Sequence, residues 1–193
     1  KGQGSVFEIS VYRYPTQNEI LARAENADTD WVYYTPTGSW VSNTSYTGKW
    51  RRQGDTMEIQ ASWATSGAPT ATNLSISIPS GYTIDTAKLS STSPSGDNTP
   101  VGTSTFFDAA IATYNGFSHY ATSTTILPLV ISAGGTYGQQ IATTNTVPFT
   151  WGAGDLGSLV ARVPITGWTN SKSAPLYVGS VTSNSSGLER VER

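Results

Sequence analysis

The sequence predicts an all-β protein, a jelly-roll-like β-sandwich preceded by a short β-rich N-terminal arm. Apolar and polar residues alternate with period two along several short segments, which is the pattern of half-buried strands. Turn residues separate these segments at regular intervals, as they do in sandwiches. Charged residues make up 12% of the chain, while Gly and Pro number 19 and 10. No segment shows the apolar periodicity of an amphipathic helix.

The first 30 residues are expected to form the arm or a small docking element. Phe7, Ile9 and Val11 share one face of a predicted strand. A polar and acidic segment at residues 25–30 precedes the aromatic strand that begins at Trp31, so we place a domain boundary near residue 30. The β-sandwich domain then covers residues 31–183, and residues 184–193 form a solvated tail. Because the chain opens on Lys1 rather than Met, we expect a processed or partial chain.

A β-hairpin is predicted around Gly54 and Asp55. A Gly-containing dipeptide between two alternating segments supplies the positive φ that tight hairpin turns require. After the turn, the apolar residues share one parity and the polar residues share the other; the apolar set is Met57, Ile59, Ala61 and Trp63. Trp63 is therefore expected in the core rather than at a ligand site.

The remaining strands follow at regular spacing. We expect the strands of the main domain near residues 31–36, 47–53, 56–64, 72–79, 103–114, 125–132, 136–143, 146–151, 157–164 and 175–182. Residues 90–100 have no period and are predicted to form an exposed loop. Between Thr125 and Ile131 both parities are apolar, so this strand should be covered on both faces, by the chain's own loops or by another subunit. A homotrimer would supply that cover.

The charge balance argues against nucleic acid as a partner. Eleven basic and thirteen acidic residues give a formal net charge of −2, and no stripe of Lys and Arg could neutralise a row of phosphates. The one cationic cluster is Lys49, Arg51 and Arg52, which we interpret as a solvated strand edge. No apolar run approaches the length of a membrane span, so membrane insertion is not expected.

The composition offers little for catalysis or metal binding. There is no Cys, and His119 is the one histidine, which disfavours thiolate sites, multi-histidine metal sites and a Ser-His-Asp triad. His119 is predicted to lie at the surface or in an interface. Asp55 and Asp155 sit in Gly-flanked turns, where they would bond to the backbone. Asp28 and Asp30 lack the Gly and Glu of a calcium loop. We therefore expect no enzyme activity, no metal and no cofactor.

The aromatic residues are the main candidates for binding, because ring faces stack on sugars and on partner surfaces while their polar edges stay hydrated. Positions in or beside loops select four candidate ligand-binding residues: Trp40, Tyr46, Tyr114 and Tyr120. A second group is predicted at an oligomer interface, where aromatic side chains concentrate: Trp31, Tyr33, Tyr34, Leu127 and Leu129. Trp168 is expected to plug one end of the sandwich.

Three segments resemble modules of bacteriophage tail-fibre and head-fibre proteins. They are Gly48-Lys49-Trp50-Arg51-Arg52-x-Gly54-Asp55-x-Met57-Glu58, the turn Ile78-Pro79-Ser80-Gly81-Tyr82-x-Ile84-Asp85, and Val163-Pro164-Ile165-x-Gly167-Trp168. The similarity covers residues 31–170 and marks hairpins and turns rather than a catalytic site. It implies a trimeric β-sandwich of jelly-roll type on the virion surface, extracellular when mature.

The resemblance implies a fibre module that binds a host-surface glycan or another receptor. Its partners would be two further copies of itself and other virion proteins of the capsid or the fibre stalk. An alternative is a capsid decoration protein that stabilises the head. A polysaccharide-active enzyme ranks third, because no carboxylate spacing predicts one.

Overall fold

The computed structural model describes residues 28–90, 99–109, 111–132 and 137–169, and Asp28–Thr169 form one compact unit. Within these ranges the chain contains strands and a single 3-10 turn, Thr86–Lys88, but no α-helix, which confirms the all-β prediction. The strands are β1 (Val32–Tyr34), β2 (Thr44–Gln53), β3 (Thr56–Ser66), β4 (Ile76–Ser77), β5 (Pro100–Asp108), β6 (Ala112–Thr122), β7 (Thr125–Ser132), β8 (Gln139–Ala142) and β9 (Ala153–Pro164). Residues 1–27 of the predicted arm, the predicted strand at 175–182 and the predicted tail lie outside the described residues.

All described strands belong to one antiparallel sheet. Its order is β1-β2-β3-β9-β5-β6-β7-β4, and β8 pairs with β7 beside β4. The last strand, β9, is thus inserted between β3 and β5, although these lie far before it in the sequence. Pairings of this kind depend on contacts between distant segments, which period-two patterns do not specify.

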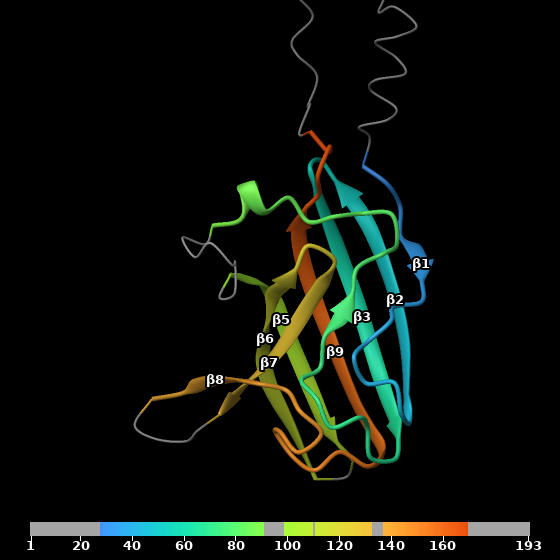
Figure 1. Ribbon diagram of the computed structural model, residues 1–193, viewed down its shortest axis with the longest axis vertical. Coiled ribbons are helices and arrows are strands. Elements are labelled where there is room, and N and C mark those ends of the chain that lie inside the picture. The colour runs from blue at the N-terminus through green and yellow to red at the C-terminus, as the bar shows by residue number, and fades with distance from the viewer. Residues whose placement is uncertain (1–27, 91–98, 110, 133–136, 170–193) are drawn as a thin grey trace, which may run out of the picture. The chain divides into compact units, whose positions relative to one another are not determined.

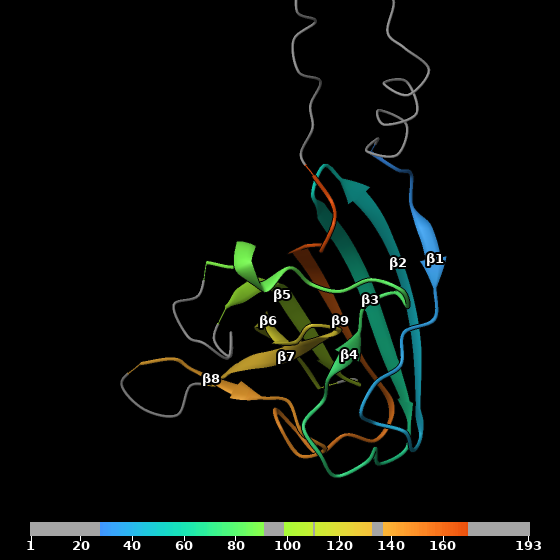
Figure 2. The ribbon, with the colours of Figure 1, turned by 45° about the horizontal axis from the view of Figure 1, so that its top comes forward.

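The sheet curls so that β4 lies beside the segment that follows β1 (Figures 1 and 2). The segment that follows β1 bonds to β4 through a bridge between Gly38 and Ile76. The Ser39 amide donates to the Ser75 carbonyl over 3.0 Å, and the Ser77 amide donates to the Thr37 carbonyl over 2.8 Å. One curled sheet therefore surrounds one core, and it has an inner face and an outer face.

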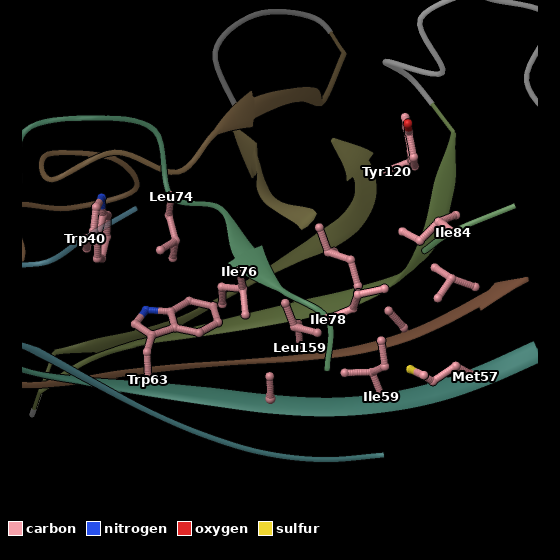
Figure 3. Close-up of a cluster of buried hydrophobic side chains, with 14 of the residues drawn as sticks. Trp40, Met57, Ile59, Trp63, Leu74, Ile76, Ile78, Ile84, Tyr120 and Leu159 are labelled. Atoms are coloured by element: carbon pink, nitrogen blue, oxygen red, sulfur yellow. The ribbon is translucent and has the colours of Figure 1, made fainter. Parts of the chain in front are cut away.

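The inner face of β3 forms one wall of the core, as its parity predicts. Met57, Ile59, Ala61 and Trp63 are all less than 5% exposed, which confirms the predicted apolar set. Figure 3 shows Met57, Ile59 and Trp63 on the same side of β3 as Ile76 and its neighbours. Buried residues of β9 complete the first wall: Leu159, Ala161 and Val163.

The β2–β3 hairpin forms as predicted. Gln53 pairs with Thr56, so Gly54 and Asp55 are the two loop residues, and Gly54 has the positive φ of 63° that this turn requires. The hairpin end also receives the last described residues, because Trp168 packs against Trp50 and Tyr82 with ring centroids 6.1 Å and 5.4 Å away. Trp168 therefore covers one end of the core, in agreement with its predicted position.

Three predicted strand boundaries are wrong. Residues 103–114 form parts of two strands, β5 and β6, because the chain turns after Asp108, where the Ile111 amide donates to the Asp108 carbonyl. That turn has no Gly or Pro, so the strongest turn signals are missing from its sequence. Residues 146–151 form a loop rather than a strand; it contains Pro148, which has no amide to donate to a ladder. Of residues 72–79, Ile76–Ser77 alone form a ladder.

Gly157 shows how tightly β3 and β9 are packed. It pairs with Trp63, and a Cβ at this position would lie 2.1 Å from the Trp63 ring. Since Trp63 is buried and packs against Phe106 and Trp151, the ring has little room to move. We expect Gly157→Ala to destabilise the fold by about 1–3 kcal/mol, measured by chemical denaturation. Gly67→Ala, which would meet the exposed side chain of Asn43 at 3.2 Å, is the control and should change stability less.

Candidate functional site

Two of the four predicted ligand-binding aromatics are in the core. Trp40 is 0% exposed and donates its indole N–H to the Thr72 carbonyl over 2.9 Å. Tyr120 is 7% exposed and lies on the inner face of β6. The prediction that these rings are accessible to a ligand is wrong, because their position beside loops does not reveal that the curled sheet encloses them.

The other two predicted aromatics are half-buried and also pack on the core. Tyr46 lies opposite Trp63 on the inner face, and its hydroxyl donates to the Trp40 carbonyl over 2.9 Å. Burial raises the pKa of Tyr46 to about 12. Tyr114 stacks on Phe149 with ring centroids 5.5 Å apart. The four predicted residues therefore do not form a shared exposed surface.

The predicted interface residues are divided between two strands. Tyr33, on the outer face of β1, is 83% exposed, whereas Tyr34 points inward and donates its hydroxyl to the Ser77 carbonyl. Burial raises the pKa of Tyr34. On β7, Leu129 is buried and Leu127 is half-buried. Five strands separate β1 from β7 in the sheet order, so the structure does not gather the predicted set into one patch.

The cationic cluster is more structured than the predicted solvated edge. On the outer face, Lys49 and Arg51 lie over the half-buried ring of Trp31, 4.8 Å and 4.7 Å from its centroid. Arg51 also pairs with Glu58 at 2.6 Å. Arg52 points to the other face, is 7% exposed and lies 4.6 Å from the centroid of Trp168. The prediction of a solvated side chain is wrong for Arg52.

A groove on the outer face is the strongest candidate site of the described residues. It has a volume of about 380 Å³, within the usual range for small-ligand sites. Strands β2, β3, β9 and β5 each contribute residues to it. The lining residues are Ser45, Thr47, Ser62, Trp63, Ala64, Thr105, Phe107, Leu156, Gly157 and Ser158.

The strand register places four hydroxyl side chains in one row across this groove. Thr47 is opposite Ser62, Ser62 is opposite Ser158, and Ser158 is opposite Thr105. Neighbouring strands lie about 4.8 Å apart, so the row spans roughly 14 Å. The Thr47 and Ser62 hydroxyls bond to each other at 2.8 Å. Among the described residues, no hydrogen bond engages the hydroxyls of Thr105 and Ser158, so both can bond to a ligand.

A second row of the groove is mainly apolar. It runs from Ser45 through Ala64 and Leu156 to Phe107. Leu156 and Phe107 are 47% and 41% exposed, which leaves an apolar surface beside the hydroxyl row. None of the ten lining residues carries a charge. The site thus combines hydrogen-bonding groups with an apolar surface and has no group that would favour a charged ligand.

The groove lies at the end of the sheet farthest from where the described chain starts and stops. Asp28 accepts a 2.7 Å hydrogen bond from the Gly54 amide at the β2–β3 turn, and Trp168 packs beside the same turn. The groove residues Ser45 and Leu156 lie near the starts of β2 and β9, and both of these strand ends are far from the β2–β3 turn (Figure 1). The long strands β2 and β9 therefore separate the groove from the β2–β3 turn, beside which Asp28 and Trp168 lie.

The carboxylates of Asp155 and Asp55 make structural contacts. Asp155 is 4% exposed and accepts hydrogen bonds from the amides of Ala109 and Gly152, which confirms its predicted backbone bonding. Asp55 pairs instead with Lys88, which also lies 3.7 Å from Asp85. In the described ranges no group of three or more His, Cys, Asp or Glu residues could hold a metal ion. No helix there is long and apolar enough to cross a membrane.

His119 also departs from its prediction. Its side chain is 4% exposed within the chain itself, so it does not lie at the surface. Local sequence does not show this, because whether the outer side of a strand is covered depends on segments that are distant in the chain.

Comparisons with protein-family models, curated proteins and solved structures find no match to this chain.

The groove was not predicted from the sequence, because its residues come from distant segments. Ser and Thr occur throughout the chain, and the four hydroxyls of the row come from segments as far apart as Thr47 and Ser158. The alternation of β2, β3 and β9 identifies outward residues, but only the register identifies which of them are neighbours.

Proposed function

We propose that this chain is a virion surface module that binds a host-surface glycan through the groove on the outer face of β2, β3, β9 and β5. The observation that carries the proposal is the pairing of a hydroxyl row with an apolar row. A sugar ring has the matching chemistry, since hydroxyl groups surround an apolar ring face that stacks on side chains such as Phe107. We also propose that the curled sheet is a jelly-roll-like β-sandwich.

The position of the groove supports attachment at one end and recognition at the other. Asp28 and Trp168 lie beside the β2–β3 turn, at the end of the sheet opposite the groove. A module held there on a capsid or a fibre stalk would present the groove outward. In this arrangement the protein acts as a homotrimer on the virion surface, extracellular when mature, and Tyr33 on the exposed edge is a candidate contact between subunits.

The absence of charge in the groove narrows the ligand to neutral sugars. Acidic sugars are usually held by Arg or Lys, and none lines this site. The role is binding rather than catalysis, because the groove also lacks the two facing carboxylates that glycosidases use.

Thr105→Arg should weaken glycan binding at least about tenfold, which corresponds to ~1.4 kcal/mol. The substitution places a long charged side chain across the hydroxyl row. Thr103→Arg is the matched control, because Thr103 also faces outward on β5 but does not line the groove. Binding would be measured on an array of neutral and acidic glycans and quantified by calorimetry. If Thr105→Arg bound the glycan as tightly as Thr103→Arg and the wild type, the groove would not be the glycan site.

The alternative role, capsid decoration, is tested by the native mass of the protein followed by pull-down with empty capsids and with whole host cells. A stable trimer that binds cells supports the receptor module. A trimer that binds capsids alone supports decoration of the head. A monomer would contradict both roles.

A further inference from the structure

His119 is a buried histidine whose ring has no hydrogen-bond partner among the described residues. Both Nδ1 and Nε2 lie unbonded, and the side chain is 4% exposed. Its neighbours in β6, Ser118 and Tyr120, point into the core, so His119 occupies the outer side of the sheet. Buried polar groups usually have partners, which makes this position exceptional.

The strands beside His119 offer no anion to balance a positive charge. Its cross-strand partners are Pro100 on β5 and Leu127 on β7. Strand β7 and strand β8 beyond it contain no titratable residue. On β5 the one carboxylate is Asp108, which pairs with Ala112 at the far end of the hairpin.

The other titratable residues of β6 and the outward charged residue of β9 do not supply a counterion either. The other titratable residues of β6 are Tyr114 and Tyr120, and both pack on the core. Beyond β5, the outward charged residue of β9 nearest this end is Arg162, a cation that donates to the Gln53 side chain. Asp97 lies outside the described residues.

We propose that His119 is an acid-sensitive element whose protonation loosens the layer formed by β5, β6 and β7. The neutral ring is tolerated between Pro100 and Leu127. The protonated ring carries a charge and two N–H donors, and a buried charge without a partner is strongly unfavourable. The layer relieves this cost by opening to water.

The direction of the pH effect follows from burial. Burial lowers the pKa of His119 below its ordinary value of about 6.5. Between the lowered pKa of His119 in the folded chain and its ordinary pKa in the unfolded chain, the unfolded chain binds more protons. Stability therefore falls as the pH drops through this window. Above about pH 6.5 both states are neutral at this position and the effect vanishes.

The single histidine makes the test direct, because one imidazole signal appears in the NMR spectrum. We expect this signal to titrate below about pH 6.5. The thermal midpoint should fall between about pH 7 and about pH 5.5, a range in which carboxylates stay ionised. Hydrogen exchange corrected for intrinsic rates should show faster opening of β5–β7 than of β2 and β3 at the lower pH.

Two variants complete the experiment. His119→Phe should remove the fall of the thermal midpoint between the two pH values, and His119→Gln serves the same purpose if the Phe variant does not fold. A histidine that titrates at or above about 6.5 in the folded protein, or a fall that persists unchanged in these variants, would overturn the proposal. If the titration midpoint were raised in the wild type and returned to normal in Asp97→Asn, Asp97 would be a counterion and the proposal would also fail.

Discussion

Replacement of Trp40 by Ala is expected to lower the free energy of unfolding by about 3–5 kcal/mol, the usual range for removal of a buried Trp. Trp40 is 0% exposed and packs edge-on against Trp151 with ring centroids 5.1 Å apart. Its indole N–H also donates to the Thr72 carbonyl. The variant therefore loses apolar contacts and leaves that carbonyl without its donor.

Chemical denaturation monitored by circular dichroism would measure this loss. Val41→Ala is the control, since its side chain is adjacent in sequence but 81% exposed, and it should change stability by less than about 0.5 kcal/mol. The loss in free energy of unfolding for Trp40→Phe should lie between the losses for Val41→Ala and Trp40→Ala, because Phe keeps part of the packing. A loss below about 1 kcal/mol for Trp40→Ala would contradict the enclosed position of this ring.

Asp155→Ala is expected to destabilise the fold by about 3 kcal/mol, on the scale of two hydrogen bonds to a charged group. Its carboxylate accepts from the Ala109 amide over 2.9 Å and from the Gly152 amide over 2.6 Å. One side chain thereby joins the β5–β6 turn to the loop that precedes β9. Its removal leaves two amides without their acceptor.

Asp155→Asn is the informative comparison, because an amide oxygen replaces one acceptor while the amide nitrogen cannot accept. We expect its loss to be about half of that for Asp155→Ala. Thermal and denaturant unfolding of both variants would provide the values. Equal stability of the Ala variant and the wild type would mean that the two backbone amides find other acceptors at no cost.

These two residues illustrate different limits of sequence analysis. Asp155 lies in a Gly-flanked segment that was predicted as a turn, so its bonding to nearby backbone was predicted. The segment is instead the start of β9, and the bond from Asp155 to Ala109 across the fold was not predicted. Trp40 lies beside no strong periodic segment, so its burial could not be inferred from parity. Local geometry depends on neighbouring residues, whereas enclosure depends on segments that are distant in the chain.

Local sequence patterns are sufficient to predict the β class, the β2–β3 hairpin and the buried face of β3. Strand parity and turn chemistry act over a few residues, so Gly54 and Trp63 carry their structural roles in the local sequence. Three features become visible only in the folded chain: the insertion of β9, the burial of His119, and the alignment of Thr47, Ser62, Ser158 and Thr105 in one row. Those features depend on which strands pair and in which register, and the free energy of that choice comes from burying distant segments together.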